Sequence, residues 1–536
     1  MTRAACLLSV LLFVPASVGA KPPVTSFPDL MDRQIIKEGD DLAVVDGLGA
    51  LAATATCESL SSLRLPGATI TMAQTVAPSA LILPRRSRPD AWTDLPAFCR
   101  VAATLEPSGD SNITIEVWLP SEGWNGRYQA VGNGGWAGVI SYGRMAEALR
   151  RGYATSSTDT GHVGNGASFA LGHPEKLIDF AYRSVHEMAL KTKAIIEAFY
   201  GTPARYSYWK GCSTGGRQGL EEAQRFPGDF DGIVAVAPAI NQARLNVSFV
   251  WVAQATLNDP ASYIPASKYA VIHDAMLQTC DARDGLADGV VDDPTRCRFD
   301  PEVLRCGGAD APTCLTAPQV EAAHKIYGGP TNPRTLQQVA PGLEPGSELR
   351  WAALAGGPTA QGVGDSYFKF VVFEDTTWDF RTFDFDRDVA RAYQRDDGLL
   401  AATDPDLTEF ASRGGKLMLI HGWSDQFISP RYSIDYYESV VERTGGSERT
   451  ADFMRLFLAP GMAHCAGGEG PNTFDSLPLI EQWVEQGKAP DQMIASRVTQ
   501  GEVDRTRPLC PYPQVARYQG AGSTDDAASF ACVDPT

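Results

Sequence analysis

Residues 206–225 read YSYWKGCSTGGRQGLEEAQR, and this stretch decides the fold. Residues 206–210 are typical of a short aromatic strand, and residues 217–225 predict a helix. Between them, residues 211–215 form the only Gly-x-Ser-x-Gly of the chain. A strand, a tight glycine turn and a helix are the parts of a nucleophile elbow, which lifts its serine out of the sheet. The sequence therefore predicts Ser213 as a nucleophile, the alternative being a glycine-rich turn with an idle serine.

Two later apolar runs predict the partners of this serine. Residues 416–420 and 453–458 are typical of buried strands, and Asp425 and His464 follow them. The order Ser213, Asp425, His464 is that of α/β-hydrolases. Each residue comes just after the carboxyl end of an expected parallel strand, where such folds gather their site residues. The sequence therefore predicts a Ser-His-Asp triad.

Three other histidines are interpreted as parts of the scaffold. His421 precedes the acid on the same expected loop, so we interpret it as a structural or pocket-lining residue. His162 and His186 are expected to be hydrogen-bonded scaffold residues.

Cysteines flank both the nucleophile and the base. Cys212 precedes Ser213 and Cys465 follows His464, which predicts a disulfide that holds the two segments together. Beyond the first twenty residues the chain has ten cysteines, an even number as expected in an oxidising compartment. Their spacing favours these further pairs, although spacing does not prove connectivity: Cys57 with Cys99, Cys280 with Cys297, Cys306 with Cys314, and Cys510 with Cys532.

The N-terminus predicts export. Residues 1–20 contain Arg3, an apolar stretch at 7–14 and small residues at 18–20, the pattern of a secretory signal peptide. Cys6 lies within the apolar stretch rather than at the cleavage site, which argues against a lipid anchor. No other stretch is long and apolar enough to span a bilayer, so no membrane partner is expected. A net charge of −18 argues against a nucleic-acid partner. We expect a secreted protein, extracellular or periplasmic.

The order of expected elements predicts an interrupted catalytic domain. At 536 residues the chain is too long for one simple core. Strands are expected at 113–119, 128–131, 154–157 and 232–237, with a long helix at 177–200, and the pattern resumes only at residue 416. The intervening residues 241–405 are rich in aromatics, proline and paired cysteines, and predict an inserted lid. The fold class is thus an α/β-hydrolase core, residues 21–240 and 406–536, with a large inserted lid domain.

One segment of the insertion predicts a cation site. Residues 280–294 read CDARDGLADGVVDDP. Clustered carboxylates repel one another unless a cation neutralises them, and hard oxygen ligands in a flexible turn favour Ca²⁺. The spacing is not that of an EF-hand. The alternative is a solvated acidic loop closed by a disulfide.

These motifs together resemble one known family. The elbow at 211–219, GWSD at 422–425 and GMAHC at 461–465 are similar to the signature of the tannase and feruloyl esterase family, which includes the mono(2-hydroxyethyl) terephthalate hydrolases. WNGRY at 124–128, GNGG at 132–135 and the aspartate-rich loop are similar as well. The resemblance extends from about Cys57 to Cys532.

The resemblance implies a set of site residues. It implies an α/β-hydrolase core with a lid, five disulfides and hydrolysis of an aromatic-acid ester by Ser213, His464 and Asp425. The backbone N–H groups of Thr214 and of Gly134 or Gly135 would bind the oxyanion. A structural Ca²⁺ would be held by the side chains of Asp281, Asp284 and Asp288 and the carbonyls of Leu286 and Val290.

The substrate is the least specified part of this expectation. Feruloyl or related hydroxycinnamoyl esters are favoured, either as small esters or linked to polysaccharide or polyphenol, while galloyl esters and a terephthalate monoester remain open. Aromatic residues of the insertion could line the acyl pocket or simply form its core; they are Tyr367, Phe368, Phe370, Phe373, Trp378 and Phe380. Two other classes also remain: a catalytically silent binding protein, and an acyltransferase or peptidase on the same scaffold.

Overall fold

A nine-stranded mixed sheet organises the protein. The structure, a computed structural model, describes residues 53–81, 94–357 and 359–535, so the expected signal peptide lies outside the described residues. All described residues belong to one compact unit. The strand order is β1-β2-β3-β5-β4-β6-β7-β8-β9. The strands are β1 (Ala68–Val76), β2 (Phe98–Leu105), β3 (Ile113–Pro120), β4 (Arg127–Val131), β5 (Ala154–Thr158), β6 (Tyr206–Cys212), β7 (Gly232–Val236), β8 (Lys416–Gly422) and β9 (Met454–Ala459).

The register brings three strand ends to one edge. β1, β2, β3 and β5 pair antiparallel, while β5, β4, β6, β7, β8 and β9 run parallel. Cys212 of β6 pairs with Val236 of β7, and Val236 in turn pairs with Ile420 of β8. Two residues later in β8, Gly422 pairs with Ala459 of β9. The loops that carry Ser213, Asp425 and His464 therefore leave the sheet at the same edge.

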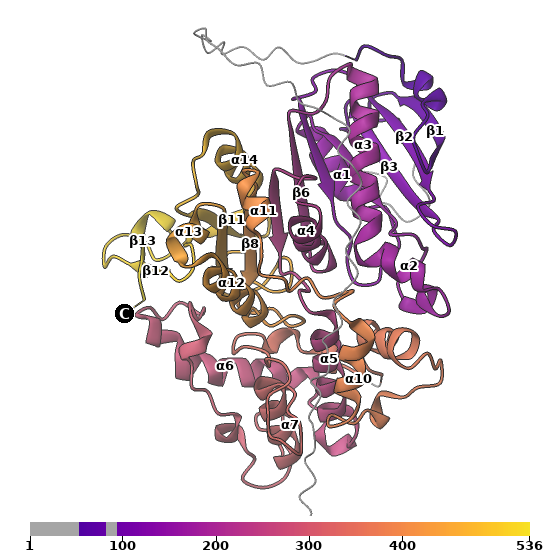
Figure 1. Ribbon diagram of the computed structural model, residues 1–536. Coiled ribbons are helices and arrows are strands. Elements are labelled where there is room, and N and C mark those ends of the chain that lie inside the picture. The colour runs from indigo at the N-terminus through magenta and orange to yellow at the C-terminus, as the bar shows by residue number, and fades with distance from the viewer. Residues whose placement is uncertain (1–52, 82–93, 358, 536) are drawn as a thin grey trace, which may run out of the picture. The chain divides into compact units, whose positions relative to one another are not determined.

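Helices pack beside these strands, as Figure 1 shows. They include α1 (Tyr142–Arg150), α3 (Ser184–Tyr200), α4 (Thr214–Arg225), α12 (Arg431–Thr444), α13 (Ser447–Ala451) and α14 (Leu477–Gln486). The helix expected at 177–200 is not continuous. It begins as α2 (Pro174–Ile178), widens into a π-helical turn at Asp179–Arg183 and continues as α3. In that turn the fully buried Asp179 accepts a hydrogen bond from Arg183 at 2.6 Å.

The segment between β7 and β8 is largely helical and shares its core with the sheet. Four of its helices lie below the sheet in Figure 1: α5 (Gln242–Leu257), α6 (Tyr269–Cys280), α7 (Ala317–Gly328) and α10 (Asp388–Asp396). α11 (Thr408–Ser412), which leads into β8, lies at the level of the sheet. The segment also contains α8 (Ala352–Ala355) and α9 (Gly362–Ser366). Leu245 and Phe249 of α5 belong to the same apolar cluster as Ile428 and Tyr432 beside β8. The insertion is thus joined to the sheet by continuous packing.

Most of the aromatic run in the insertion forms a second core. Tyr367, Phe368, Trp378 and Phe380 are buried there together with Trp136 from the loop after β4. The Trp136 indole N–H also donates to the carbonyl of Val363 at 3.0 Å. These four rings therefore pack the insertion against the glycine-rich loop. They form part of the core of the insertion, as considered in the sequence analysis as an alternative to lining the acyl pocket. Phe370 and Phe373 are partly buried at the edge of this cluster.

Two small sheets and five disulfides complete the described chain. β10 (Met493–Thr499) pairs with β11 (Glu502–Leu509), and β12 (Val515–Tyr518) pairs with β13 (Phe530–Val533). These four strands, and β1 and β2, were not among the expected elements. The disulfides are the five expected pairs: Cys57–Cys99, Cys212–Cys465, Cys280–Cys297, Cys306–Cys314 and Cys510–Cys532.

Candidate active site

Ser213 occupies a strained turn between β6 and α4. Its φ of 61° and ψ of −121° are rare for a residue with a side chain, and its N–H donates to the carbonyl of Val236 at 2.9 Å. A Cβ on Gly211 would lie 2.3 Å from the carbonyl oxygen of Gly215, so the turn requires glycine there. This is the local geometry of a nucleophile elbow.

The glycine-rich loop after β4 lies against this elbow. Asn133 accepts a hydrogen bond from the N–H of Gly215 at 2.8 Å, and the Thr214 hydroxyl donates to the carbonyl of Gly135 at 2.9 Å. Within the described part of the chain, the N–H groups of Gly134, Gly135 and Thr214 donate no hydrogen bond. The predicted oxyanion donors are thus neighbours with uncommitted N–H groups.

Asp425 and His464 form a close pair beyond the ends of β8 and β9. His464 Nδ1 lies 2.7 Å from Asp425 Oδ2, and the backbone N–H groups of Phe427 and Ile428 donate to Asp425 Oδ1 at 2.8 and 2.9 Å. Burial alone would raise the pKa of Asp425, but the attraction of His464 and hydrogen bonds from His421 and His464 outweigh burial and lower it. Asp425 is therefore an ionised carboxylate that orients His464.

His421 is a second histidine on the same carboxylate. It is the penultimate residue of β8, not a loop residue as expected, and it is fully buried. Its Nε2 lies 3.2 Å from Asp425 Oδ2 and 3.0 Å from the carbonyl of Ile428. Because both neighbours are acceptors, Nε2 carries the proton, and Nδ1 accepts from the hydroxyl of Ser433 at 2.8 Å. His421 is fixed in one tautomer, which suits a structural role.

The disulfide between Cys212 and Cys465 links the elbow to the histidine loop. The two Cα atoms are 5.9 Å apart, although the residues are separated by 253 positions. Cys212 directly precedes Ser213 and Cys465 directly follows His464. The chain contains no shorter covalent connection between these two predicted catalytic residues.

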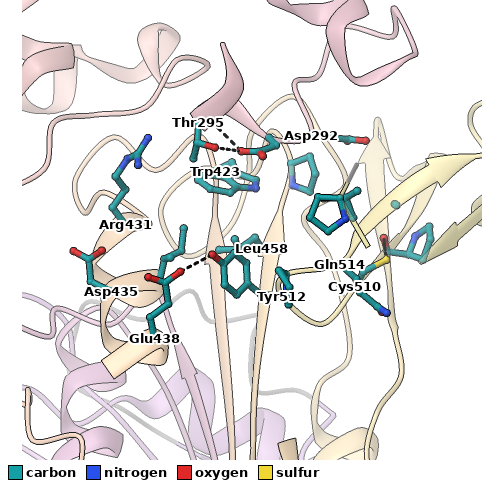
Figure 2. A pocket seen from close by; sticks show the side chains of 18 residues that line it. Asp292, Thr295, Trp423, Arg431, Asp435, Glu438, Leu458, Cys510, Tyr512 and Gln514 are labelled. Carbon is teal, nitrogen blue, oxygen red and sulfur yellow. Dashed lines mark hydrogen bonds between the residues drawn. The ribbon is translucent and has the colours of Figure 1, made fainter. Parts of the chain in front are cut away.

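The cavity drawn in Figure 2 is separate from these residues. It has a volume of about 310 Å³ and is lined by Trp423, Arg431, Asp435 and Tyr512, among others. The Tyr512 hydroxyl donates to Glu438 at 2.8 Å across its wall. None of Ser213, Asp425 and His464 lines it.

The aspartate-rich loop has oxygens that fit a hard cation. Burial and neighbouring carboxylates raise the pKa of Asp284 to about 6 and that of Asp292 to about 7, Arg507 opposing the shift at Asp292. Asp292 Oδ1 is buried without a hydrogen-bond partner. Asp281 accepts the N–H of Gly289 at 3.0 Å. Such a set of close, incompletely neutralised carboxylates suits Ca²⁺, and Asp292 was not among the expected ligands.

One expected ligand is already paired with a cation of the protein. Asp288 Oδ2 lies 2.5 Å from Arg507 and 3.5 Å from Arg505. Its other oxygen accepts the N–H of Val290 at 3.2 Å. An ion at this loop would share Asp288 with Arg507.

Comparisons with known proteins assign the family. Residues 99–533 match the family model described as tannase and feruloyl esterase. The chain belongs to this family. An uncharacterized esterase of Xanthomonas campestris pv. campestris is 41% identical over 548 residues, covering 92% of this chain and 94% of that protein. The crystal structure of feruloyl esterase B from Aspergillus oryzae superposes with a TM-score of 0.83 at 32% identity, covering 89% of this chain and 99% of that chain.

A third relative extends the likeness to tannases. Tannin acyl hydrolase from Aspergillus niger has a TM-score of 0.74 at 25% identity, covering 88% of this chain and 93% of that chain. The family member described here is therefore a carboxylic ester hydrolase with an α/β-hydrolase-like fold. Among the residues that the structure describes, no helix has the length and apolarity to cross a membrane.

Proposed function

We propose that this protein is a secreted serine esterase that hydrolyses esters of aromatic acids through Ser213, His464 and Asp425. The observation that carries the proposal is the 2.7 Å contact between His464 Nδ1 and Asp425 Oδ2. The loop of His464 is also linked to the nucleophile segment by the disulfide between Cys465 and Cys212, the residue before Ser213. With Asp425 ionised, the proton of His464 lies on Nδ1 and its Nε2 is free to act as a base.

The reaction follows from these roles. His464 Nε2 takes the Ser213 hydroxyl proton as Oγ attacks the ester carbonyl carbon, and the carbonyl oxygen becomes an oxyanion. The imidazolium then gives its proton to the leaving alcohol as the carbon–oxygen bond breaks, leaving an acyl-enzyme. Water, deprotonated by His464, attacks this acyl group, and the imidazolium returns the proton to Ser213 Oγ as the bond between Oγ and the acyl carbon breaks, which releases the acid and regenerates Ser213. Asp425 stabilises the imidazolium in both steps.

The oxyanion is assigned to backbone donors. The N–H of Thr214 and one from Gly134 or Gly135 are proposed to bind it, supported by the contact of the Thr214 side chain with Gly135. The amide of Thr214 is also at the first turn of α4, where unpaired N–H groups favour negative charge. Each such donor is worth a factor of ~10² to 10³ in rate.

For the acyl group we favour ferulate or a related hydroxycinnamate. The likeness to feruloyl esterase B supports this choice, and the likeness to tannin acyl hydrolase supports galloyl esters as the second candidate. A terephthalate monoester is a third. The segment at 241–405 is proposed to act as the lid that shapes this specificity, because the aromatic cluster of Tyr367 packs on Trp136 next to Gly135. Such esters on polysaccharide or polyphenol remain candidate natural substrates.

A structural Ca²⁺ is proposed for the aspartate-rich loop. The side chains of Asp281, Asp284 and Asp288 and the carbonyls of Leu286 and Val290 would hold it. The buried Asp292 Oδ1 supports a cation there, because it has no hydrogen-bond partner and its ion pair with Arg507 is long, at 3.6 Å. The ion would neutralise the loop. No reacting group belongs to this loop, so we assign the ion to stability.

A substrate panel with one variant tests the proposal. Methyl ferulate, methyl caffeate, methyl gallate and mono(2-hydroxyethyl) terephthalate are compared with wild type and Ser213→Ala. We expect turnover of at least one aromatic ester, fastest for ferulate, and its loss in Ser213→Ala with an unchanged melting curve. Full activity in Ser213→Ala would exclude this nucleophile. Transfer of the acyl group to added alcohols in preference to water would instead indicate an acyltransferase. Failure to turn over any of the esters would indicate a binding protein.

A further inference from the structure

A histidine and two carboxylates meet in a second polar cluster, between α3 and the end of α4. His186 lies on α3, Glu222 on α4, and Asp229 in the loop before β7. One ligand atom of each lies within 4.8 Å of the others, and in the described ranges this is the one such group of three histidine, cysteine or acidic side chains. Glu222 is eight residues, about 12 Å along a helix, from Thr214. The cluster is therefore separate from the candidate active site.

The buried carboxyl group of Glu222 is the feature that calls for a ligand. Glu222 is only 1% exposed, and neither of its carboxyl oxygens has a hydrogen-bond partner. Buried polar groups are nearly always paired, so these two oxygens need either a proton or a cation. A proton shared between Glu222 and Asp229 would satisfy part of this need. The hydrogen bond between His186 and Asp229 is compatible with either a proton or a cation at this site.

The position of His186 favours a cation. Its Nδ1 lies 2.7 Å from Asp229 Oδ2, and its ring stacks on Phe226 with centroids 3.8 Å apart and an interplanar angle of 13°. The imidazole is thus held in the plane that aims a nitrogen at the carboxylates. One nitrogen and two carboxylate oxygens are ligands for Zn²⁺ and similar first-row divalent ions.

The dimensions of the cluster also fit such an ion. Around a tetrahedral Zn²⁺ with bonds of about 2.1 Å, ligand atoms are about 3.4 Å apart. The His186 and Asp229 atoms that now lie 2.7 Å apart would separate slightly, and the atoms that are up to 4.8 Å apart would move inward, so the adjustment is small. The His186 side chain is 25% exposed, which gives the ion a path from solvent. Lys193 is close enough to attract the Glu222 carboxyl group, and its ammonium donates to the carbonyl of Gly228 at 3.3 Å. Two carboxylates outnumber this one cation.

We propose that His186, Glu222 and Asp229 bind one divalent transition-metal cation of the Zn²⁺ type. The ion would join α3, the last turn of α4 and the loop that leads into β7. It would act as a structural link behind the sheet. This site does not depend on the proposed function, because none of its ligands belongs to the candidate active site.

Cobalt and zinc binding to the full-length protein test the site. Protein stripped with a chelator is returned to excess Ca²⁺, so that the aspartate-rich loop is saturated, and titrated with Co²⁺. We expect one Co²⁺ per chain with a visible absorption band, and a higher melting temperature with Zn²⁺. His186→Ala and the isosteric Glu222→Gln should each weaken Co²⁺ binding by at least ~10-fold, a loss that even changes outside the ligand sphere produce. Circular dichroism checks that both variants are folded.

The matched control is His173→Ala. His173 pairs with Asp110 at 3.0 Å in the same way, but half of its side chain is exposed, and among the described residues no third ligand completes a group with it. This variant should bind Co²⁺ like wild type. The proposal is overturned if wild type binds no Co²⁺, which would leave a shared proton as the explanation of Glu222. It is equally overturned if His186→Ala and folded Glu222→Gln bind Co²⁺ with unchanged affinity. It is also overturned if the bound ion blocks ester hydrolysis and only replacement of His464 abolishes Co²⁺ binding.

Discussion

Removing the disulfide between Cys212 and Cys465 should affect stability and catalysis separately. The bridge closes a loop of 253 residues, and in the chain-entropy treatment this corresponds to about 5.5 kcal/mol of stability. Cys510–Cys532 closes only 22 residues and corresponds to about 3.4 kcal/mol. Replacing either pair by alanine should thus destabilise the protein by several kcal/mol, with a difference of about 2 kcal/mol between them.

The rate effects should differ far more than the stabilities. Cys465 adjoins His464, and its φ of 66° shows that the backbone turns sharply there. Without the bridge, the His464 loop is free to shift relative to Ser213, and a displacement of ~1 Å costs ~10²-fold in rate. Cys510 and Cys532 join the end of β11 to β13 and adjoin neither predicted catalytic residue. Only the first double variant should lose ~10²-fold in kcat.

The assay is hydrolysis of methyl ferulate at a temperature well below both melting transitions. The kcat of each double variant is divided by its folded fraction, taken from circular dichroism. Equal normalised rate losses in the two variants would refute the reasoning, because the effect would then follow lost stability rather than position. An intact kcat in Cys212→Ala/Cys465→Ala would refute it as well.

Three further predictions follow from the site. Chelation of Ca²⁺ should lower the melting temperature more than the mild-temperature kcat, and a metal-loaded protein whose melting is indifferent to chelator would argue against the loop site. His421→Ala should lower kcat by about tenfold and His421→Gln should restore part of it, because the amide can again donate to Asp425; equal activity of both variants and wild type would contradict this positioning role. The folded-state pKa of Asp425 is depressed, so its contribution to stability is present above its unfolded pKa of about 4 and is lost as pH falls towards the folded value. Unfolding free energies measured against pH should therefore decline less steeply in acid for Asp425→Asn, and parallel curves would contradict the shift.

The parts of the fold that could be read from sequence are those with strong local apolar patterns. β7, β8 and β9 are largely buried on both faces, so their sequences are mostly apolar runs, whereas β6 is marked by aromatic residues before the glycine turn. β1 was missed because it lies at the sheet edge, with most residues partly or fully exposed, and depends on pairing with β2. Such long-range pairing leaves little local signal.

α4 begins earlier than expected for a related reason. The sequence favoured a start at Arg217, because Gly215 and Gly216 are poor helix formers, yet the helix starts at Thr214. A Cβ on Gly216 would lie 2.8 Å from the carbonyl oxygen of Val236, so glycine is needed for the helix to approach β7. Tertiary packing here outweighs helix propensity.

The residues of the candidate site also fall into two groups, those that the sequence predicts and those that it does not. Ser213, Asp425 and His464 could be found because each has a motif and follows a strand. The contact of His421 with Asp425 and the burial of Asp292 Oδ1 without a hydrogen bond could not be found, because they depend on where single carboxylate oxygens point after folding. His186 was expected to be a hydrogen-bonded scaffold residue, and its contact with Asp229 agrees with that. The nearby Glu222 had no signal in the sequence.

The apolar cluster shared by α5 and the sheet limits how this enzyme can be re-engineered. Leu245 and Phe249 of the insertion pack in the same cluster as Ile428 and Tyr432, which flank the loop of Asp425. A chimera that takes the whole insertion from a relative would therefore combine the insertion's side chains of this apolar cluster from one protein with the sheet's side chains from the other. Mismatched volumes in such an interior cost 1–3 kcal/mol or more per site, roughly. Recombination between relatives should place its crossovers so that α5 and α12 come from the same parent.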